Sequence, residues 1–143
     1  MLVFDKWTCN TNGRQALFIR KRDEDKGSED GCYRAVMIDQ GFCFNAGEWN
    51  FPDAPLRGLY ARNRVYEGVT GRESFKPWLD RLEHRIDGRA LDGLIREVPP
   101  EWYEDDLDSL YRLAEQLDRR RLRVPEFLLE AKVSNRRPFL NWT

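Results

Sequence analysis

Asp39 stands at the most suggestive position for chemistry, because it comes directly after an apolar run over residues 33–38 and precedes Gln40 and Gly41. The run is typical of a buried strand, and a carboxylate at the end of such a strand is a ligand of the kind that Mg²⁺ prefers. Asp beside a Gly-containing turn is also common at strand ends, where its side chain caps the turn. For Asp39 taken alone, the structural interpretation is favoured.

A second polar segment, residues 8–15, is rich in Asn and Gly and precedes a strand-like run over residues 16–21. Another strand-like run covers residues 32–38, and the polar residues 22–31 between the two predict an exposed hairpin connection. The start of the first strand of an antiparallel hairpin lies beside the end of the second. We therefore expect residues 8–15 to lie beside Asp39, in an arrangement suited to phosphoryl transfer.

The elements that position these residues change in character near Gly71. Apolar residues recur at intervals of three and four over residues 75–86 and 107–117, which predicts two amphipathic helices. A shorter helix is expected over residues 90–97 and a last one over residues 125–133. The sequence predicts an α+β fold in which a short β-hairpin is followed by a helical bundle.

The domain organisation follows from length and composition. A chain of 143 residues with 41% hydrophobic residues is long enough for one domain with its own core. We expect a single domain over residues 1–143, β-rich over residues 1–71 and helical over residues 72–143. Asp105 and Asp106 are expected in the first turn of the helix that follows them.

The charge balance argues against several partner classes. The chain has 24 Lys and Arg residues against 25 Asp and Glu residues, so its net charge of -1 gives no general attraction to nucleic acid or an anionic membrane. Three Cys residues and the single His84 do not have the spacing of a zinc site. We expect a cytoplasmic protein with free thiols and with neither nucleic acid nor membrane as a partner.

The two polar segments together resemble a known family. "CNTNGRQALF" followed by "MIDQGF" is similar to the catalytic loop and the metal-binding Asp-x-Gly motif of kinase-fold proteins, in particular the HipA-like kinases. The loop of that family is approximately N-T-D-G-H-x-x-N, which Asn10, Thr11 and Gly13 match. Asp39 and Gly41 match the metal motif. The resemblance covers residues 4–45 and implies the C-terminal lobe of a kinase-like protein.

The chain departs from the family's pattern at two positions. Asn12 occupies the position of the family's catalytic Asp, and its amide cannot accept a proton at neutral pH. Leu17, which has no ligand atom, occupies the position of the metal-binding Asn. Gln15, which lies in the same loop, and Asp5, just before it, are candidates for substitute oxygens.

The resemblance implies ATP and Mg²⁺ as cofactors and a protein Ser/Thr hydroxyl or another alcohol as the acceptor. In that interpretation Asp39 ligates Mg²⁺, Gln15 and Gly41 complete the cofactor site, and Asn10 and Asn12 orient the loop and the acceptor. Asp5 is a further candidate for the catalytic group.

No Gly-rich phosphate loop and no strand lysine precede the matching segment, although kinases normally use both to hold ATP. A truncated gene, a fragment and one half of a split protein all remain open as explanations. We expect weak or absent activity in the isolated chain, and an N-lobe, another partner protein or a second copy as its partner. The alternative is a pseudokinase-like interaction module without catalysis.

Overall fold

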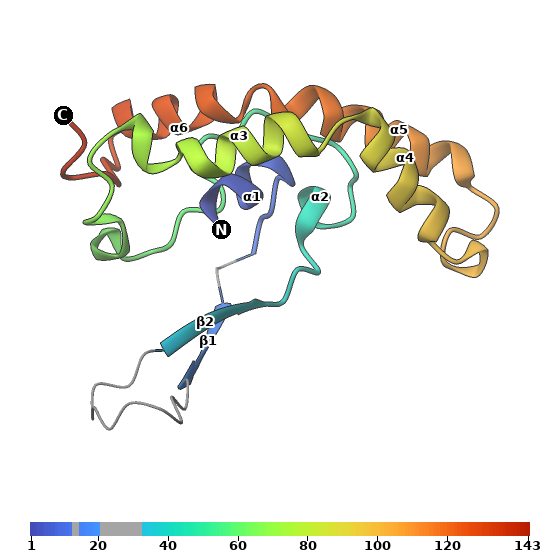
Figure 1. Cartoon of the computed structure of the whole chain (residues 1–143), viewed down its shortest axis with the longest axis horizontal. Coiled ribbons are helices and arrows are strands. Elements are labelled where there is room, and N and C mark those ends of the chain that lie inside the picture. Colours follow the sequence, from blue (N-terminus) through green and yellow to red (C-terminus); the bar gives the residue numbers. More distant parts are fainter. Residues whose placement is uncertain (13–14, 21–32) are drawn as a thin grey trace.

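The computed structural model describes residues 1–12, 15–20 and 33–143. It has an α+β fold in which the hairpin projects from a layer of helices (Figure 1), as the sequence predicts at this level. The helices and strands are, in chain order, α1 (Leu2–Trp7), β1 (Gln15–Arg20), β2 (Tyr33–Ile38), α2 (Cys43–Ala46), α3 (Lys76–Arg85), α4 (Gly88–Glu97), α5 (Leu107–Arg121) and α6 (Val124–Val133). Short 3-10 turns cover Asn63–Tyr66, Arg72–Ser74 and Pro100–Trp102.

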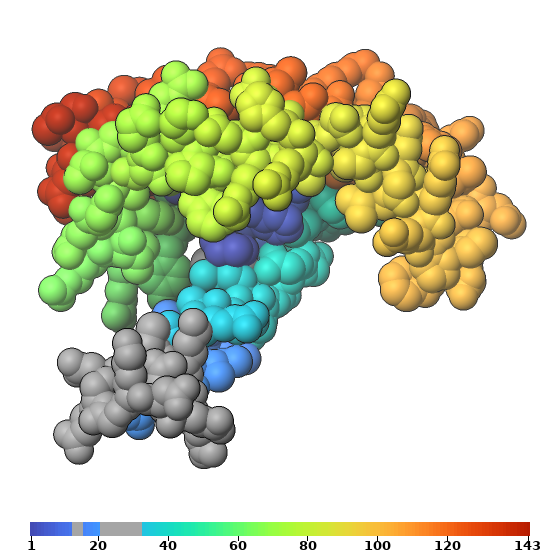
Figure 2. All heavy atoms as spheres, viewed as in Figure 1, coloured from blue at the N-terminus to red at the C-terminus, as the bar shows by residue number. Residues whose placement is uncertain are grey.

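The hairpin pairs β1 and β2 antiparallel, with Gln15 opposite Ile38 and Arg20 opposite Tyr33. This pairing confirms the prediction, whereas the expected connection over residues 22–31 lies outside the described residues. The expectation of a buried second strand is wrong, because Tyr33 is 60% exposed and only the last three residues of β2 are half-buried. No further strand joins the two-stranded sheet within the described residues, so its faces are only partly covered. Figure 2 shows β2 standing below the helical layer.

The helices after residue 71 lie where the apolar periodicity predicts them. α4 begins two residues earlier than expected, because the Asp87 side chain accepts a hydrogen bond from Ala90 N at 2.9 Å and caps the helix. Asp106 caps α5 by accepting from Ser109 N at 3.2 Å, so it precedes the first turn that we expected it to occupy. Asp105 lies outside that helix with a φ of 65°.

Helix α1 (Leu2–Trp7) is a correction, because residues 1–71 were expected to be β-rich and no helix was predicted in them. Six residues are too few for an apolar period to be visible, and so short a helix is marginal without tertiary contacts. Leu2 and Val3 supply those contacts, since both are buried in a cluster with residues of α3 and α6. The first 71 residues therefore contain helix as well as the hairpin.

Two apolar clusters hold the helical layer together. The larger one joins α1, α3 and α6 with the C-terminal Phe139, and its other members are Leu2, Val3, Phe75, Leu79, Leu82, Val124, Leu128 and Ala131. The smaller one joins α4 and α5 through Leu91, Ile95, Leu113, Ala114 and Leu117. Trp7 packs against both clusters and donates from Nε1 to the Leu117 carbonyl oxygen at 2.9 Å. Helix α1 thus connects the two clusters.

Candidate functional site

A buried polar pair, Asp5 and Asn10, forms the centre of the candidate site. Asn10 Nδ2 donates to Asp5 Oδ1 at 3.0 Å. Asn10 is 1% exposed and Asp5 is 2% exposed. The backbone N–H of Asn10 also donates to the Asp5 carbonyl oxygen at 3.0 Å. The turn that follows α1 therefore folds back and fixes the Asp5 carboxylate in one place.

The same turn meets the end of β2. Asn10 Nδ2 lies 3.5 Å from Gln40 Oε1, and Thr11 N donates to the Phe42 carbonyl oxygen at 3.1 Å. The expectation that the polar segment lies beside the end of the second strand is confirmed for the described residues before residue 13. Hairpin geometry explains the meeting, because both segments adjoin the same end of the strand pair.

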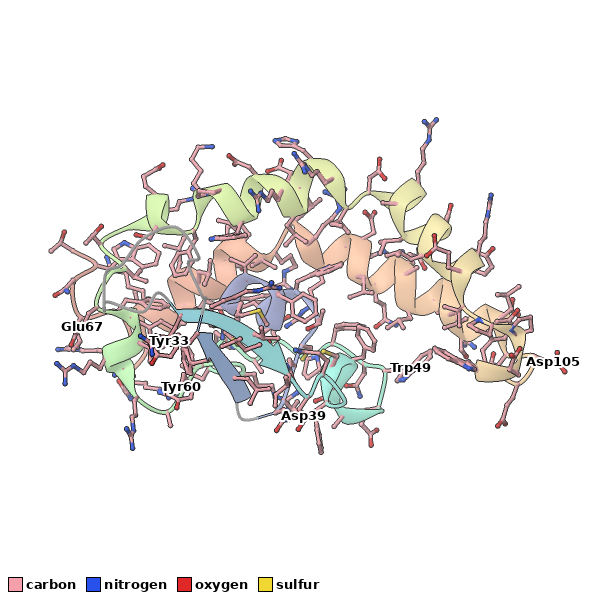
Figure 3. All side chains as sticks on the ribbon, turned by 60° about the horizontal axis from the view of Figure 1, so that its bottom comes forward. Tyr33, Asp39, Trp49, Tyr60, Glu67 and Asp105 are labelled. Atoms are coloured by element: carbon pink, nitrogen blue, oxygen red, sulfur yellow. The ribbon has the colours of Figure 1, made fainter. Side chains whose placement is uncertain are left out.

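Asp39 follows β2 as an exposed residue with a φ of 58°, at the hairpin end nearest α2 (Figure 3). A Cβ added at Gly41 would lie 3.6 Å from Asp39 Oδ1, so the carboxylate lies close to the Gly41 backbone. Asp39 directly precedes Gln40, whose side-chain oxygen lies 3.5 Å from Asn10 Nδ2. The structure brings Asp5, Asn10 and the Asp39–Gly41 segment into one neighbourhood.

The remaining predicted residues are placed as follows. The backbone of Gln15 pairs with Ile38. Asn10 Oδ1 accepts from the Asn12 backbone N–H at 3.0 Å, and Asn12 Nδ2 is buried without a hydrogen-bond partner among the described residues. Gly13 lies outside the described residues. The described part of the chain contains no cluster of three or more His, Cys, Asp or Glu side chains suited to a metal ion.

An unusual left-handed turn forms one wall of this neighbourhood. Phe44 and Asn45 in α2 have φ values of 58° and 60°, which L-residues seldom adopt in succession. Phe44 N donates to the Thr8 carbonyl oxygen at 2.7 Å, and Asn45 N donates to that of Cys9 at 3.2 Å. These bonds hold the chain after Asp39 against the polar turn after α1.

Two buried cations, Lys6 and Arg120, contact α1 and the loop before α3. Lys6 Nζ donates to the carbonyl oxygens of Pro55 and Arg57, and Arg120 Nε donates to the Lys6 carbonyl oxygen at 2.8 Å. Arg120 Nη1 also donates to Phe51 O at 3.2 Å. Burial, followed by the positive charge of Arg120, lowers the pKa of Lys6 to about 7. Both side chains thus bind carbonyl oxygens of the segment over residues 51–57 and hold it next to α1.

Sequence reasoning missed these two cations. Lys6 follows Asp5 without any pattern that marks it as buried, and Arg120 stands within a basic run, residues 119–123, that is typical of a solvated helix end. Its position on the face of α5 that carries Leu113 and Leu117 is the one signal that would have identified it as buried.

Gly58 makes the close approach to Asp5 possible. Its φ is 72°, and an added Cβ would lie 2.6 Å from Asp5 Cβ, closer than real Cβ atoms approach other atoms. Glycine is therefore needed here both for its backbone conformation and for the space that it leaves beside Asp5.

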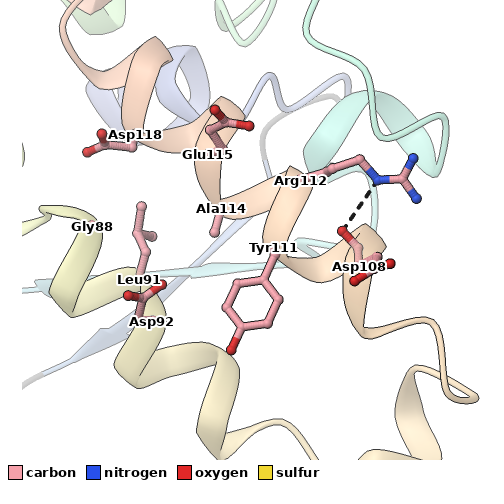
Figure 4. Close-up of a pocket in the computed structure, with 9 residues that line it drawn as sticks. All are labelled: Gly88, Leu91, Asp92, Asp108, Tyr111, Arg112, Ala114, Glu115 and Asp118. Atoms are coloured by element: carbon pink, nitrogen blue, oxygen red, sulfur yellow. Dashed lines mark hydrogen bonds between the residues drawn. The ribbon is translucent and has the colours of Figure 1, made fainter.

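A separate cleft of about 720 Å³ lies between α4 and α5 (Figure 4). Its lining includes four carboxylates, from Asp92, Asp108, Glu115 and Asp118. The lining residue Arg112 donates from Nε to the Asp108 carbonyl oxygen at 3.3 Å. The cleft shares none of its lining residues with the Asp5 neighbourhood.

Comparisons with protein-family models, with curated proteins and with solved structures find no match for this chain. Within the described residues, no helix combines the length and the apolar character that crossing a membrane requires.

Proposed function

We propose that the chain is a kinase-fold lobe similar to that of the HipA-like kinases, and that it takes part in transfer of the γ-phosphoryl group of ATP to a hydroxyl. The observation that carries this proposal is the 3.0 Å contact of Asn10 with Asp5, at the end of the hairpin that also presents Asp39. One carboxylate next to the acceptor and another next to the metal are the two protein charges that such a reaction uses.

The spacing of Asp5 and Asn10 supports a specific division of roles. Four residues separate them, as in the D-x-x-x-x-N segment of protein-kinase catalytic loops, where Asp accepts the substrate proton and Asn binds the second Mg²⁺. Under this assignment Asp5 is the base and Asn10 a metal ligand, and Asn12 shapes the turn. The departures at Asn12 and Leu17 then no longer remove a chemical role, because Asp5 and Asn10 supply both.

Under this proposal, Asp39 and Asn10 are the residues that would hold Mg²⁺. Mg²⁺ in phosphoryl-transfer sites takes one or two protein carboxylates, phosphate oxygens and waters. Asp39 supplies an exposed carboxylate, and the Asn10 carbonyl oxygen has a second lone pair besides the one that accepts from Asn12. When bound, Mg²⁺ neutralises charge on the phosphates. Asp39 would hold the metal, and Gln15 and Gly41 would shape the backbone around it.

Nucleotide binding to the full chain tests this proposal. A fluorescent ATP analogue should bind in the presence of Mg²⁺, and Asp39→Asn should abolish that dependence, since a neutral amide binds hard cations much less well than a carboxylate. Asp92→Asn, which neutralises an exposed carboxylate on α4, is the matched control and should bind as the native chain does. Nucleotide binding that is indifferent to Mg²⁺ and to Asp39→Asn would contradict the proposal.

The rate of phosphotransfer distinguishes Asp5 from residue 12 as the position of the catalytic base. With an N-lobe supplied in trans, Asp5→Asn should lower phosphotransfer by about 10²–10⁴-fold if Asp5 is the base. Asn12→Asp should leave the rate near that of the native chain under the same assignment. If Asn12→Asp instead raises the rate and Asp5→Asn does not lower it, the base belongs at residue 12, as the family alignment places it.

The exposed hairpin favours a second candidate function, a non-catalytic interaction module. Phe18 is 70% exposed, and Leu17 and Ile19 beside it are also exposed, so β1 presents apolar side chains to solvent. Such surfaces mark sites of association. An interaction module would associate through this strand without binding Mg-ATP. Sedimentation of the native chain and of Phe18→Ser should then show association that the substitution weakens, while the nucleotide titration shows no Mg-ATP binding.

A further inference from the structure

A groove of about 510 Å³ lies between α1, α3 and the end of β2, and we call it the α1–α3 groove. Helix α3 lines it with Trp78, Arg81, Leu82 and Arg85. Residues three and four positions apart share one face of a helix, which is the relation of both arginines to Leu82 or Trp78. This face of α3 therefore presents two cations and an aromatic ring to the same groove.

The walls of the α1–α3 groove are mostly aromatic and apolar. Phe4 and Trp7 line it from α1, and their rings meet edge to face with centroids 6.1 Å apart. The Trp7 ring is held in place because its Nε1 donates to the Leu117 carbonyl oxygen at 2.9 Å. Trp78 on the opposite side is 52% exposed. Ring surfaces that are open to water in this way favour a flat apolar group that would cover them.

The charge of the groove is positive. Arg81 and Arg85 lie one helical turn apart, and Arg81 Cζ is 4.9 Å from the centroid of the Trp78 ring. Neither guanidinium forms a salt bridge with a carboxylate in the part of the chain that the structure describes. The described lining contains no Asp or Glu, and the lining residue Met1 adds no negative charge. The groove therefore favours an anion over a cation.

Volume and lining together narrow the class of ligand. A volume of about 510 Å³ lies within the usual range for small-molecule sites. A guanidinium binds a carboxylate through two parallel N–H···O bonds, which gives both strength and orientation. A small hydrophilic anion such as inorganic phosphate would leave the aromatic walls in contact with water and would gain nothing from them. The favoured ligand thus combines a carboxylate with an apolar ring system.

We propose that the α1–α3 groove binds a small aromatic carboxylate. The ring system lies against Trp78 and the Phe4–Trp7 pair, and the carboxylate accepts hydrogen bonds from the guanidinium groups on α3. This inference does not depend on the proposed phosphoryl transfer. Gln40 also lines the groove, and its Oε1 lies 3.5 Å from Asn10 Nδ2, so the ligand binds next to a residue that contacts the Asp5–Asn10 pair.

Three matched probes test the groove in the full chain without nucleotide. 2-Naphthoate should shift the amide NMR signals of Phe4, Gln40 and Arg85 saturably, with a Kd of about 0.1–1 mM for so few atoms. 2-Naphthylmethanol has the same rings without the charge and should bind about tenfold more weakly. Decahydronaphthalene-2-carboxylate keeps the charge and the carbon skeleton without the aromatic faces, and it should bind about threefold more weakly than 2-naphthoate.

Substitutions at the exposed groove residues separate the two parts of the ligand. Arg81→Gln and Arg85→Gln should each weaken 2-naphthoate binding about three- to tenfold and leave 2-naphthylmethanol nearly unchanged. Arg96→Gln, which removes one positive charge from an exposed position on α4, is the control and should change neither. Trp78→Ala should weaken both probes, whereas Trp102→Ala removes a tryptophan that is 76% exposed outside the groove and should weaken neither.

Several results would overturn this assignment. Equal binding of 2-naphthoate and 2-naphthylmethanol, or equal losses for Arg85→Gln and Arg96→Gln, would show that the arginines do not recognise the carboxylate. Tighter binding of the saturated acid would exclude an aromatic ligand. Displacement of 2-naphthoate by Mg-ATP would make the groove part of a nucleotide site. Asp39→Asn, which tests the proposed function, should not weaken 2-naphthoate binding, so the two proposals can fail separately.

Discussion

The α4–α5 pair and the N-terminal segment with its polar turn differ in how much buried polar contact holds them together. The two helices meet through apolar residues, and the charged groups that lie between them line a cleft. The buried Arg120 of α5 bonds to α1 and not to α4. The N-terminal segment instead buries Asp5, Lys6, Thr8 and Asn10 within ten residues. Apolar packing is non-directional, whereas each of these polar groups needs a partner at a defined distance and angle.

The difference predicts where the chain tolerates change. A helix pair with an apolar contact accepts side chains of similar volume, with modest losses of stability. A buried polar network tolerates few substitutions, because removal of one side chain leaves its partners without hydrogen bonds. Candidate chemistry in the N-terminal segment thus coincides with the part of the fold that permits the fewest alternatives.

The largest effect is expected from Arg120→Ala. The change removes the donor to the carbonyl oxygens of Lys6 and Phe51 and the guanidinium that stacks 4.5 Å from the Phe127 ring centroid. The free energy of unfolding should fall by about 3–5 kcal/mol. Arg119→Ala is the control, because Arg119 pairs with Glu115 on the exposed face of α5 and should cost less than about 0.5 kcal/mol. Urea denaturation of both variants measures the two losses in the free energy of unfolding. Equal losses would contradict the special role of the buried Arg120.

Gly58→Ala tests the close approach to Asp5. The added methyl group must displace α1 or the segment around Gly58 and also holds alanine at a positive φ, so a loss of about 2–4 kcal/mol is expected. Gly93→Ala in the middle of α4 meets no atom within 4 Å and should stabilise the chain by up to about 1 kcal/mol. The midpoint temperature of thermal unfolding, measured by circular dichroism, should therefore fall for Gly58→Ala and rise for Gly93→Ala.

Lys6 gives the stability of the N-terminal segment a dependence on pH. The folded chain holds Lys6 with its pKa lowered to about 7, below the unfolded value of 10.5, so the unfolded state binds the extra proton between these pH values. The free energy of unfolding should rise with pH across this window, by at most about 1.4 kcal/mol per pH unit. Below pH 7 both states are protonated, and the contribution of Lys6 no longer changes.

Lys6→Met removes that slope. Stability measured from pH 7 to pH 9.5 in the native chain and in the variant should diverge steadily, whatever constant difference the lost hydrogen bonds introduce. Parallel curves would show that Lys6 keeps its proton in the folded state throughout this range.

The smallest effect is expected at the start of α4. Asp87→Ala removes the acceptor for Ala90 N and should cost about 1 kcal/mol. Asp92→Ala, an exposed position within the same helix, should change stability by less than about 0.5 kcal/mol. A larger loss at Asp87 than at Gly58 would reverse the contrast between the two regions.

The helices from α3 onward could be predicted because each has enough turns for its apolar period to appear in the sequence. The hairpin could be predicted from two β-branched and aromatic runs on either side of a polar connection. Helix α1 could not, because its stability comes from contacts with α5 and α6 that lie more than a hundred residues away. The exposure of β2 was missed for a related reason, since an apolar run does not reveal whether another element covers it.

For the candidate site, the sequence predicted the meeting of the polar turn with the end of β2, since hairpin geometry requires it. It did not predict that Asn10 would bond to Asp5, because that contact depends on α1 being helical and on the tight turn after it. Burial of Lys6 could not be predicted, because its partners are the carbonyl oxygens of Pro55 and Arg57, 49 and 51 positions away. Burial of Arg120 could be inferred only from its position on the apolar face of α5.

The hydrogen bond between Arg120 Nε and the Lys6 carbonyl oxygen also sets an order of events during synthesis. The two residues are 114 positions apart, and a ribosome that adds about 5–20 residues per second needs about 6–23 s to cover that distance. For that interval α1 has left the ribosome without α5 and α6, and a helix of six residues is not stable alone. The Asp5–Asn10 centre must therefore be among the last parts of this chain to form, after the α4–α5 pair has had the chance to fold locally.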